Sequence, residues 1–451
     1  MKNEFTEADW ERCTEILQAI AQEPGLIDER ERVRTLIAKI NRQGRKRARR
    51  LEREAIQEHD QRIIGEVIAQ REPLTYKGLA AGLPDTDEKR ILRSPRMCYV
   101  CKERYQELHF FYHYLCPECA EVHFAKRYQG CDLTGRVAVL TGGRVKIGYQ
   151  TGLSCLRNGA KLYVTTRFPA DGLRRYQMEP DFDEWGHRLF LYGLDLRHVR
   201  GIYEFVAYLE EREESVDILI NNAAQTVKRP LSFYQHLLAP PEDENAPQLV
   251  QGDVDLLELK REDIPLLGTL DRLFPEGELD VDGQQIDKRA VTSWMLSLSE
   301  VGLVEMLEVQ LVNMVAPFIL CGQLKPLFLR SSFERKFMIN VSAMEGQFSR
   351  INKTHYHPHT NMAKAALNML TRTSAGEYAE DGIYMNSVDT GWVTDESPWP
   401  KQQRLAEEGF HPPLDIVDGM ARIMDPIYTG ITSEEEPIYG KFLKDYVVYP
   451  W

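Results

Sequence analysis

The chain has 451 residues and a formal net charge of −13, which allows two or three domains and excludes a protein that binds polyanions over its whole surface. No apolar run approaches the length of a membrane-spanning helix, and the N-terminus lacks the pattern of a signal peptide, so no membrane association is expected. Four of the eight cysteines form two CxxC pairs, which favours a metal site in a reducing compartment over disulfides and predicts a cytoplasmic protein.

Residues 1–90 are predicted to form a charged, helical N-terminal region. Apolar residues recur there at helical spacing, first at Leu17 and Ile20 and then from Val33 to Ile40. The basic run Arg45–Arg50 could contact nucleic acid or an acidic protein surface. The simpler interpretation is a solvated helix face, because glutamates follow the run closely.

Residues 91–130 are predicted to form a small metal-binding module, similar to a zinc ribbon. Its ligands would be two pairs, Cys98 with Cys101 and Cys116 with Cys119, with fourteen residues between the pairs. Each pair brings two thiolates to one ion, and two pairs complete the tetrahedral sulfur site that suits zinc. Four thiolates leave no open coordination position, so the zinc is expected to be structural.

From residue 131 to the end, short apolar runs alternate with helical patterns, which predicts an α/β fold with a Rossmann-like, doubly wound parallel sheet. The first run, 137–140, ends in a glycine turn, and a helix is expected to open near Gly148. A strand, a glycine turn and a helix N-terminus together bind phosphate through free backbone N–H groups. Further strands are expected at 161–166, 188–194, 216–220, 336–341, 383–388 and 440–444.

The order of these motifs resembles the short-chain dehydrogenase/reductase family over about residues 132–395. The resemblance implies hydride transfer between a nicotinamide cofactor and a carbonyl or alcohol. The cofactor-binding residues that it implies are Thr141, Gly142, Ile147, Gly148, Asp195, Leu196, Asn222, Ala223, Thr390, Gly391 and Val393. The catalytic residues that it implies are Asn313, Ser342 and Lys364, of which Lys364 would also hold the nicotinamide ribose.

The tyrosine of the family's YxxxK motif is replaced in this chain. Thr360 stands four residues before Lys364, and a threonine hydroxyl is too weak an acid to pass a proton near pH 7. Tyr356 or His359 could take over this role, and a histidine is well suited to proton transfer at neutral pH. The alternative is that the proton donor is missing.

The glycine turn carries Lys146 where the family usually has a glycine. Arg144 lies in the same turn, and Arg167 follows the second strand. Arginine at these positions suits the 2′-phosphate of NADP(H), with NAD(H) as the alternative cofactor. Lys146 would either add positive charge to a phosphate site or obstruct it.

An acidic, turn-rich insertion at about 228–292 separates Asn222 from Asn313. We expect this insertion to lie beside the mouth of the site, where it would be a lid, a partner surface or a tolerated surface insertion. The protein is expected to form a homo-oligomer. The favoured function is an NADP(H)-dependent oxidoreductase with an altered proton donor and an unidentified small-molecule substrate. The alternative is a catalytically silent nucleotide-binding protein that acts as a sensor or scaffold through its zinc module and basic helix.

Overall fold

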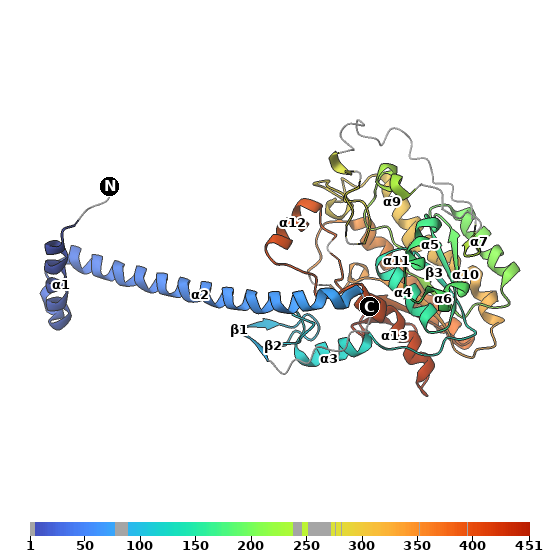
Figure 1. Cartoon of the computed structure of the whole chain (residues 1–451), viewed down its shortest axis with the longest axis horizontal. Helices are drawn as coiled ribbons and strands as arrows, with labels where there is room; N and C mark the ends of the chain where they lie inside the picture. Colours follow the sequence, from blue (N-terminus) through green and yellow to red (C-terminus); the bar gives the residue numbers. More distant parts are fainter. Residues whose placement is uncertain are drawn as a thin grey trace.

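A computed structural model describes residues 5–76, 89–237, 246–250, 272–275, 277–280, 282–350, 352–394 and 396–451. Three parts follow one another along the chain in Figure 1: a long helical arm, a small module with two strands, and an α/β domain. The inner end of the arm lies against the module and the α/β domain, while its outer end projects away from both.

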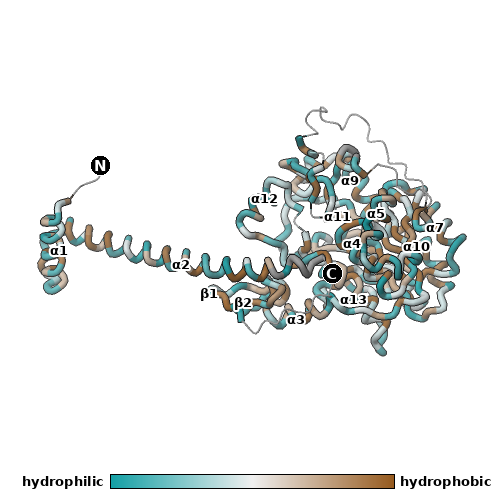
Figure 2. Tube along the Cα trace, viewed as in Figure 1, coloured by the Kyte–Doolittle hydropathy of each residue, from teal (hydrophilic) through white to brown (hydrophobic). Residues whose placement is uncertain are grey.

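The arm consists of α1 (Glu7–Gln22), the 3-10 turn η1 (Pro24–Ile27) and α2 (Glu31–Tyr76). Thr6 and Asp9 form a capping box that starts α1. Only the inner end of α2 packs, where Ile63 and Val67 are buried. Figure 2 shows polar and apolar residues alternating along the outer part of the arm, and residues 38–55 are all exposed.

The small module contains β1 (Arg90–Met97), β2 (Arg104–Leu108) and α3 (Pro117–Lys126). The two strands pair antiparallel, and Lys102 adopts a left-handed backbone conformation in the turn between them, at φ +65°. The aromatic segment that follows is buried, including Phe111 and Tyr112. These side chains form one apolar core with the base of α2.

The α/β domain is built on a nine-stranded sheet in the order β11-β10-β9-β8-β6-β3-β4-β5-β7. Its strands are β3 (Val137–Thr141), β4 (Lys161–Thr166), β5 (Leu189–Gly193), β6 (Ile218–Asn221), β7 (Leu249–Val250), β8 (Lys336–Ser342), β9 (Ile383–Asp389), β10 (Phe442–Lys444) and β11 (Val447–Tyr449). All neighbours pair parallel except β10 with β11. The doubly wound sheet predicted from the sequence is therefore confirmed, with an antiparallel edge strand that the sequence pattern did not indicate.

Helices cover both faces of the sheet, which is why its strands are apolar on both sides. They are α4 (Lys146–Arg157), α5 (Pro169–Gln177), α6 (Phe182–Trp185), α7 (Val199–Arg212), α9 (Leu303–Gln310), α10 (Ala316–Leu329), α11 (Pro358–Glu380), α12 (Trp399–Glu407) and α13 (Ile416–Thr432). Short turns lie at Gly186–Arg188, Leu231–Leu237, Ser293–Met295 and Met344–Gly346. One buried cluster packs α4, α5 and α13 on one face, and a second packs α7 and α10 on the other.

Helices α9 and α10 run on through a π-helical segment, Leu311–Val315. The continuous stretch Leu303–Leu329 is long and apolar enough to cross a membrane by length and composition alone. In this fold it packs against α7 and α11, and it buries Leu320, Leu324 and Phe328 in the domain core.

Candidate active site

The glycine turn after β3 has the geometry of a phosphate-binding turn. Gly142 has φ +72°, and a Cβ added to Gly148 would lie 2.1 Å from the carbonyl oxygen of Gly142. The Asn222 side chain donates to the carbonyl oxygens of Thr141 and Gly142 at 3.1 and 3.0 Å. Thr141 Oγ1 accepts from the backbone N–H groups of Asn222 and Ala223. The predicted turn and the Asn222 segment therefore lock each other in place.

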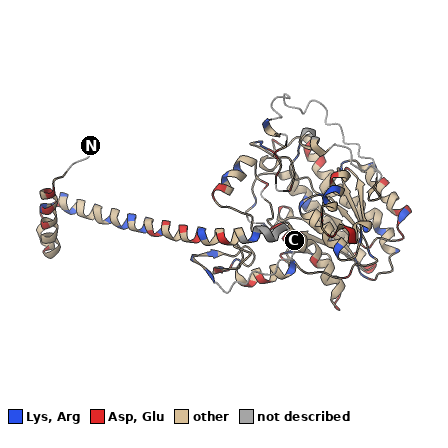
Figure 3. Cartoon of the chain, in the orientation of Figure 1, with Lys and Arg blue, Asp and Glu red and all other residues tan. Residues whose placement is uncertain are grey.

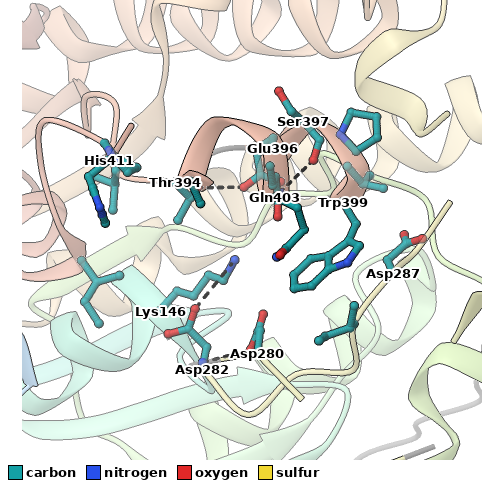
Figure 4. Close-up of a pocket in the computed structure, with 18 of the residues that line it drawn as sticks. Lys146, Asp280, Asp282, Asp287, Thr394, Glu396, Ser397, Trp399, Gln403 and His411 are labelled. Carbon is teal, nitrogen blue, oxygen red and sulfur yellow. Dashed lines mark hydrogen bonds and ion pairs between the residues drawn. The ribbon is translucent and has the colours of Figure 1, made fainter. Parts of the chain in front are cut away.

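Lys146 holds φ +54°, the region that favours glycine, and it is the first residue of α4. Its ammonium lies 3.9 Å from the carboxylate of Asp282, in the inserted segment (Figure 4). The lysine therefore keeps the backbone shape of the glycine that it replaces, and its charge is turned toward the insertion.

A cavity of about 380 Å³ opens above this turn. Ten of the predicted cofactor-binding residues line it, namely Gly142, Arg144, Lys146, Ile147, Gly148, Arg167, Asp195, Leu196, Asn222 and Ala223. Tyr234 and Gln284, both from the insertion, close its other side. The ends of β3, β4, β5 and β6 thus meet at one groove, as expected for a parallel sheet.

The two arginines at the β4 end of this cavity differ in their partners. Arg144 is buried and forms a 2.5 Å ion pair with Asp171, a carboxylate that it shares with Arg174 and Arg175, so its charge is partly compensated. Arg167 forms no ion pair within the described part of the chain, and its guanidinium lies over the Tyr234 ring at 4.5 Å. Burial alone would raise the pKa of Tyr234, but Arg167 and Arg229 outweigh it and lower that pKa.

Asp195 is buried at the end of the third predicted strand and is tied to Arg197. Its Oδ2 accepts from the Arg197 guanidinium at 2.6 Å, and its Oδ1 accepts from the Arg197 backbone N–H. Arg197 also lies 3.3 Å from Glu308. The carboxylate is fixed at the edge of the cavity where the resemblance places the adenine side.

Ser342, Thr360 and Lys364 form a buried polar wall that lines neither this cavity nor the larger one described below. Lys364 donates to the carbonyl oxygen of Val341 at 2.7 Å, and burial lowers its pKa to about 8. The hydroxyls of Ser342 and Thr360 find no hydrogen-bond partner among the described residues. Unpartnered buried hydroxyls are costly in a folded protein, and they are typical of sites that bind a ligand.

Asn313 lies in the π-helical segment, and its side-chain amide is used by the backbone of Gln225. Its Oδ1 accepts from the Gln225 N–H at 2.7 Å, and its Nδ2 donates to the Gln225 carbonyl at 3.1 Å. Asn313 therefore fixes the segment after β6 against the helix.

The two candidates for the missing acid lie in different surroundings. His359 is buried, both ring nitrogens lack a hydrogen-bond partner among the described residues, and its Nε2 lies 3.6 Å from Glu305. Tyr356 is only half-buried and stacks near the exposed His355. His357, between them, stacks on Trp294 at 3.8 Å and caps the start of α11.

Glu305 is a site residue that the sequence motifs did not indicate. Burial raises its pKa, but the neighbouring His359 and Ser293 outweigh burial and hold the pKa below its ordinary value. The ionised form of this carboxylate is therefore favoured beside the imidazole.

A second, larger cavity of about 920 Å³ adjoins the first (Figure 4). The two cavities share Lys146, Val227, Arg229, Thr394 and Glu396. Its walls come from the base of α2, the insertion at 279–287 and the segment 393–416. It contains the predicted cofactor residue Val393, whereas Thr390 and Gly391 line neither cavity.

The four predicted metal ligands come together. The Sγ atoms of Cys98, Cys101, Cys116 and Cys119 all lie within 4.8 Å of one another. The Cys116 N–H donates to Cys98 Sγ at 3.3 Å, a backbone contact that supports a thiolate. This set of sulfur donors fits a single tetrahedral ion.

Comparison with known proteins identifies the family of the α/β domain. A family model described as short chain dehydrogenase matches residues 136–236, and one described as enoyl-(acyl carrier protein) reductase matches residues 290–407. The chain is 33% identical over 353 residues to an uncharacterized protein of Acanthamoeba polyphaga mimivirus, which covers 74% of this chain and 72% of that protein. The chain belongs to the short-chain dehydrogenase/reductase family.

Other relatives match shorter stretches. Retinol dehydrogenase 13 of Homo sapiens is 33% identical over 91 residues, which is 20% of this chain and 27% of that protein. Among solved structures, an NADPH-bound carbonyl reductase from chicken fatty liver has 18% identity and a TM-score of 0.47, and the match covers 71% of this chain and all of that one.

Proposed function

We propose that the chain is an NADP(H)-dependent oxidoreductase that interconverts a carbonyl and an alcohol on a small molecule. The observation that carries the proposal is the groove over the carboxyl ends of the strands. The glycine turn and the ends of β4, β5 and β6 line it. Ser342 ends β8, the strand next to β6 in the sheet, and the buried Lys364 donates to the neighbouring Val341 carbonyl. When bound, the nicotinamide would supply or accept the hydride, and the protein supplies the anion site and the proton.

Preference for the 2′-phosphate rests on Arg167. It lies at the end of β4, where it lines the cavity and makes no ion pair within the described residues. Arg144 would add less, because its guanidinium is already paired with Asp171. A dianionic phosphate beside an uncompensated guanidinium gains charge-assisted hydrogen bonds that a ribose hydroxyl cannot match.

Proton transfer is assigned to His359, with Glu305 as the group that orients it. The imidazole is buried beside a carboxylate, on the same helix as Lys364, and its Nδ1 has no partner among the described residues. Ser342 would orient the substrate oxygen, and Lys364 would hold the ribose. Tyr356 is the less favoured donor because it lies nearer the surface.

The four-cysteine cluster is proposed to hold one structural zinc ion. All eight cysteines are described and none forms a disulfide, which supports a reducing, cytoplasmic setting. Four thiolates would cross-link the two turns of the module.

The proposal is tested by titration calorimetry of the purified protein with NADPH and with NADH. We expect NADPH to bind at least tenfold more tightly, which is about 1.4 kcal/mol. Equal affinities would exclude the role given to Arg167. Binding of neither cofactor would exclude the oxidoreductase assignment and would favour the silent alternative.

A homo-oligomer is proposed through neighbouring helices of the α/β domain. Leu307 on α9, Phe318 on α10, and Met362 and Met369 on α11 are each at least half exposed. Helices α9 and α10 both pack against α11, so these apolar side chains lie on adjacent helices. A second copy of the chain would remove them from water.

A second candidate function, nucleic-acid binding by the arm, is favoured by one observation. Five of the six residues Arg45–Arg50 are basic, and all are exposed on α2, away from the acidic body (Figure 3). The test is binding of a labelled RNA to the full chain at low and at physiological salt. Absence of binding at low salt would exclude this function.

A further inference from the structure

One of the contacts between the four-cysteine module and the α/β domain starts in the cysteine turn itself. Tyr99 lies between Cys98 and Cys101, and its phenol oxygen accepts a hydrogen bond from the backbone N–H of Trp392 at 3.0 Å. The two residues are 293 positions apart. The contact therefore depends entirely on how the module docks.

The Tyr99 side chain is oriented by the turn that carries the cysteines. Its backbone N–H donates to the Tyr114 carbonyl at 2.8 Å within the module. The ammonium groups of Lys102 and Lys444 lie over its ring at 5.2 and 5.3 Å, one from the module and one from β10. The aromatic ring therefore contacts a cation from each part, and its hydroxyl is directed at one backbone amide.

The segment that Tyr99 contacts borders the reacting end of the site. Asp389, the last residue of β9, pairs directly with Ser342 across the sheet. Gly391 then has φ +78°, and a Cβ there would lie 2.5 Å from Leu414. Thr394, three residues further on, lines both cavities. The Trp392 amide is therefore the point at which the cysteine turn itself contacts the loop 390–394.

The module is firmly attached on the same side. Its apolar core includes Val393 and Leu414, and Ile147 of the glycine turn packs against it. Arg127 of the module pairs with Asp415 at 2.7 Å and with Asp418 at 3.0 Å, and these groups are buried. These contacts fix the position of the module on the α/β domain. A change in the conformation of the cysteine turn would therefore alter the loop 390–394 through the Tyr99 hydrogen bond to Trp392.

We propose that Tyr99 is a positioning residue for the loop 390–394 and that the four-cysteine module is thereby a working part of the cofactor site at its Ser342 end. This inference rests on the proposed binding of NADP(H). The Arg167 end of the groove lies four strands away in the sheet order, at β4, and the Tyr99 contact does not reach it. The contact should therefore affect the nicotinamide half of the cofactor and leave the adenosine half unaffected.

The test compares Tyr99→Phe with Tyr105→Phe in the zinc-loaded full chain. Tyr105 is the control, because its hydroxyl also makes one hydrogen bond, which it donates to the His113 carbonyl at 2.8 Å inside the module. We expect Tyr99→Phe to weaken NADPH about tenfold and to leave the affinity for 2′,5′-ADP, which lacks the nicotinamide, unchanged. Tyr105→Phe should change neither affinity. Equal weakening of both ligands, or of neither, by Tyr99→Phe would overturn the proposal.

A second measurement requires no cofactor. Amide hydrogen exchange of the segment containing Trp392 should speed up about tenfold in Tyr99→Phe and not in Tyr105→Phe, with zinc content unchanged in both. Unchanged exchange would overturn the proposal whether or not NADPH binds. If exchange is faster in Tyr99→Phe but the wild type binds no NADPH, the contact between Tyr99 and Trp392 is supported. The absence of NADPH binding would then overturn both the role of Tyr99 in the cofactor site and the proposed function.

Discussion

The Glu305 carboxylate lies 3.6 Å from the His359 imidazole, inside the helical layer that also carries Lys364. A buried carboxylate beside a histidine can orient the imidazole ring. His359 stands on α11 next to Thr360, the position that has lost the family's tyrosine, and Glu305 reaches it from α9, so the pair gives the chain a candidate for the missing acid.

We expect His359→Gln to lower kcat about 100-fold with a smaller change in KM, because general acid catalysis typically contributes about that much. Glu305→Gln should lower kcat less, since it removes only the orienting charge. Tyr356→Phe is the matched control and should leave kcat nearly unchanged. The reverse order, with Tyr356→Phe the more damaging, would assign the proton to the tyrosine. The measurement is steady-state reduction of a panel of aldehydes and ketones.

Substitution of Arg167 and of Arg144, each alone, should separate an effect on cofactor affinity from an effect on the free energy of unfolding. Arg167→Gln should weaken NADPH at least tenfold while leaving NADH and the free energy of unfolding unchanged. Arg144→Gln should instead lower the free energy of unfolding by roughly 1.5 kcal/mol, because Asp171 loses one of its three arginine partners and keeps Arg174 and Arg175. Calorimetric titration and urea unfolding on the same samples would show both effects. Loss of NADPH affinity in Arg144→Gln without loss of stability would contradict this division.

The Lys364 pKa of about 8 gives stability a defined pH dependence. Below pH 8 the Lys364 amine is charged in both the folded and the unfolded chain, and burying this charge lowers the free energy of unfolding. Between about pH 8 and 10.4 the unfolded chain holds a proton that the folded chain has lost, so stability rises with pH, by at most roughly 3 kcal/mol. Urea unfolding from pH 7 to 10 should show this rise in wild type and a flatter curve in Lys364→Met. Identical slopes would mean that the amine keeps an ordinary pKa.

We expect one zinc ion per chain, measured by atomic emission. Cys119→Ser should lower the metal content and reduce the thermal stability of the chain. Cys13→Ser provides the control, because Cys13 is exposed on α1, far along the chain from the cluster. Full zinc content in Cys119→Ser would show that the ion is held elsewhere.

The proposed oligomer predicts that Phe318→Glu reduces the molar mass in solution to that of one chain, since the buried charge would have no partner. Light scattering after size exclusion would measure it. Phe348→Glu alters an even more exposed phenylalanine outside these helices and should leave the mass unchanged. A wild type that is already monomeric would exclude the proposed interface.

Several features of the site were predictable because they are local. Thr141, Gly142 and Gly148 lie within eight residues, and their spacing alone fixes a strand, a turn and a helix start. The two CxxC pairs indicated a shared ion for the same reason. Lys146 was recognised as a departure from the family, but its glycine-like φ could be seen only in the structure.

The partners of charged side chains were not predictable, because they come from distant parts of the chain. Arg144 appeared equivalent to Arg167 in the sequence, yet the fold gives Arg144 a carboxylate 27 residues away and leaves Arg167 facing the cavity. Glu305 carries no motif, and only the packing of α9 on α11 brings it to His359.

The sequence by itself therefore indicated the alternating strands and helices of the α/β domain, the four cysteines that cluster and the replacement of the tyrosine, because periodicity and short motifs record what neighbouring residues do. Only the tertiary structure decided which cation is paired, which histidine has a carboxylate, and that Tyr99 reaches the Trp392 amide. Those outcomes depend on how helices and loops that are far apart in the sequence pack together. Packing removes water from charges and hydrogen-bonding groups, and this desolvation sets how much each of them contributes to the free energy of folding.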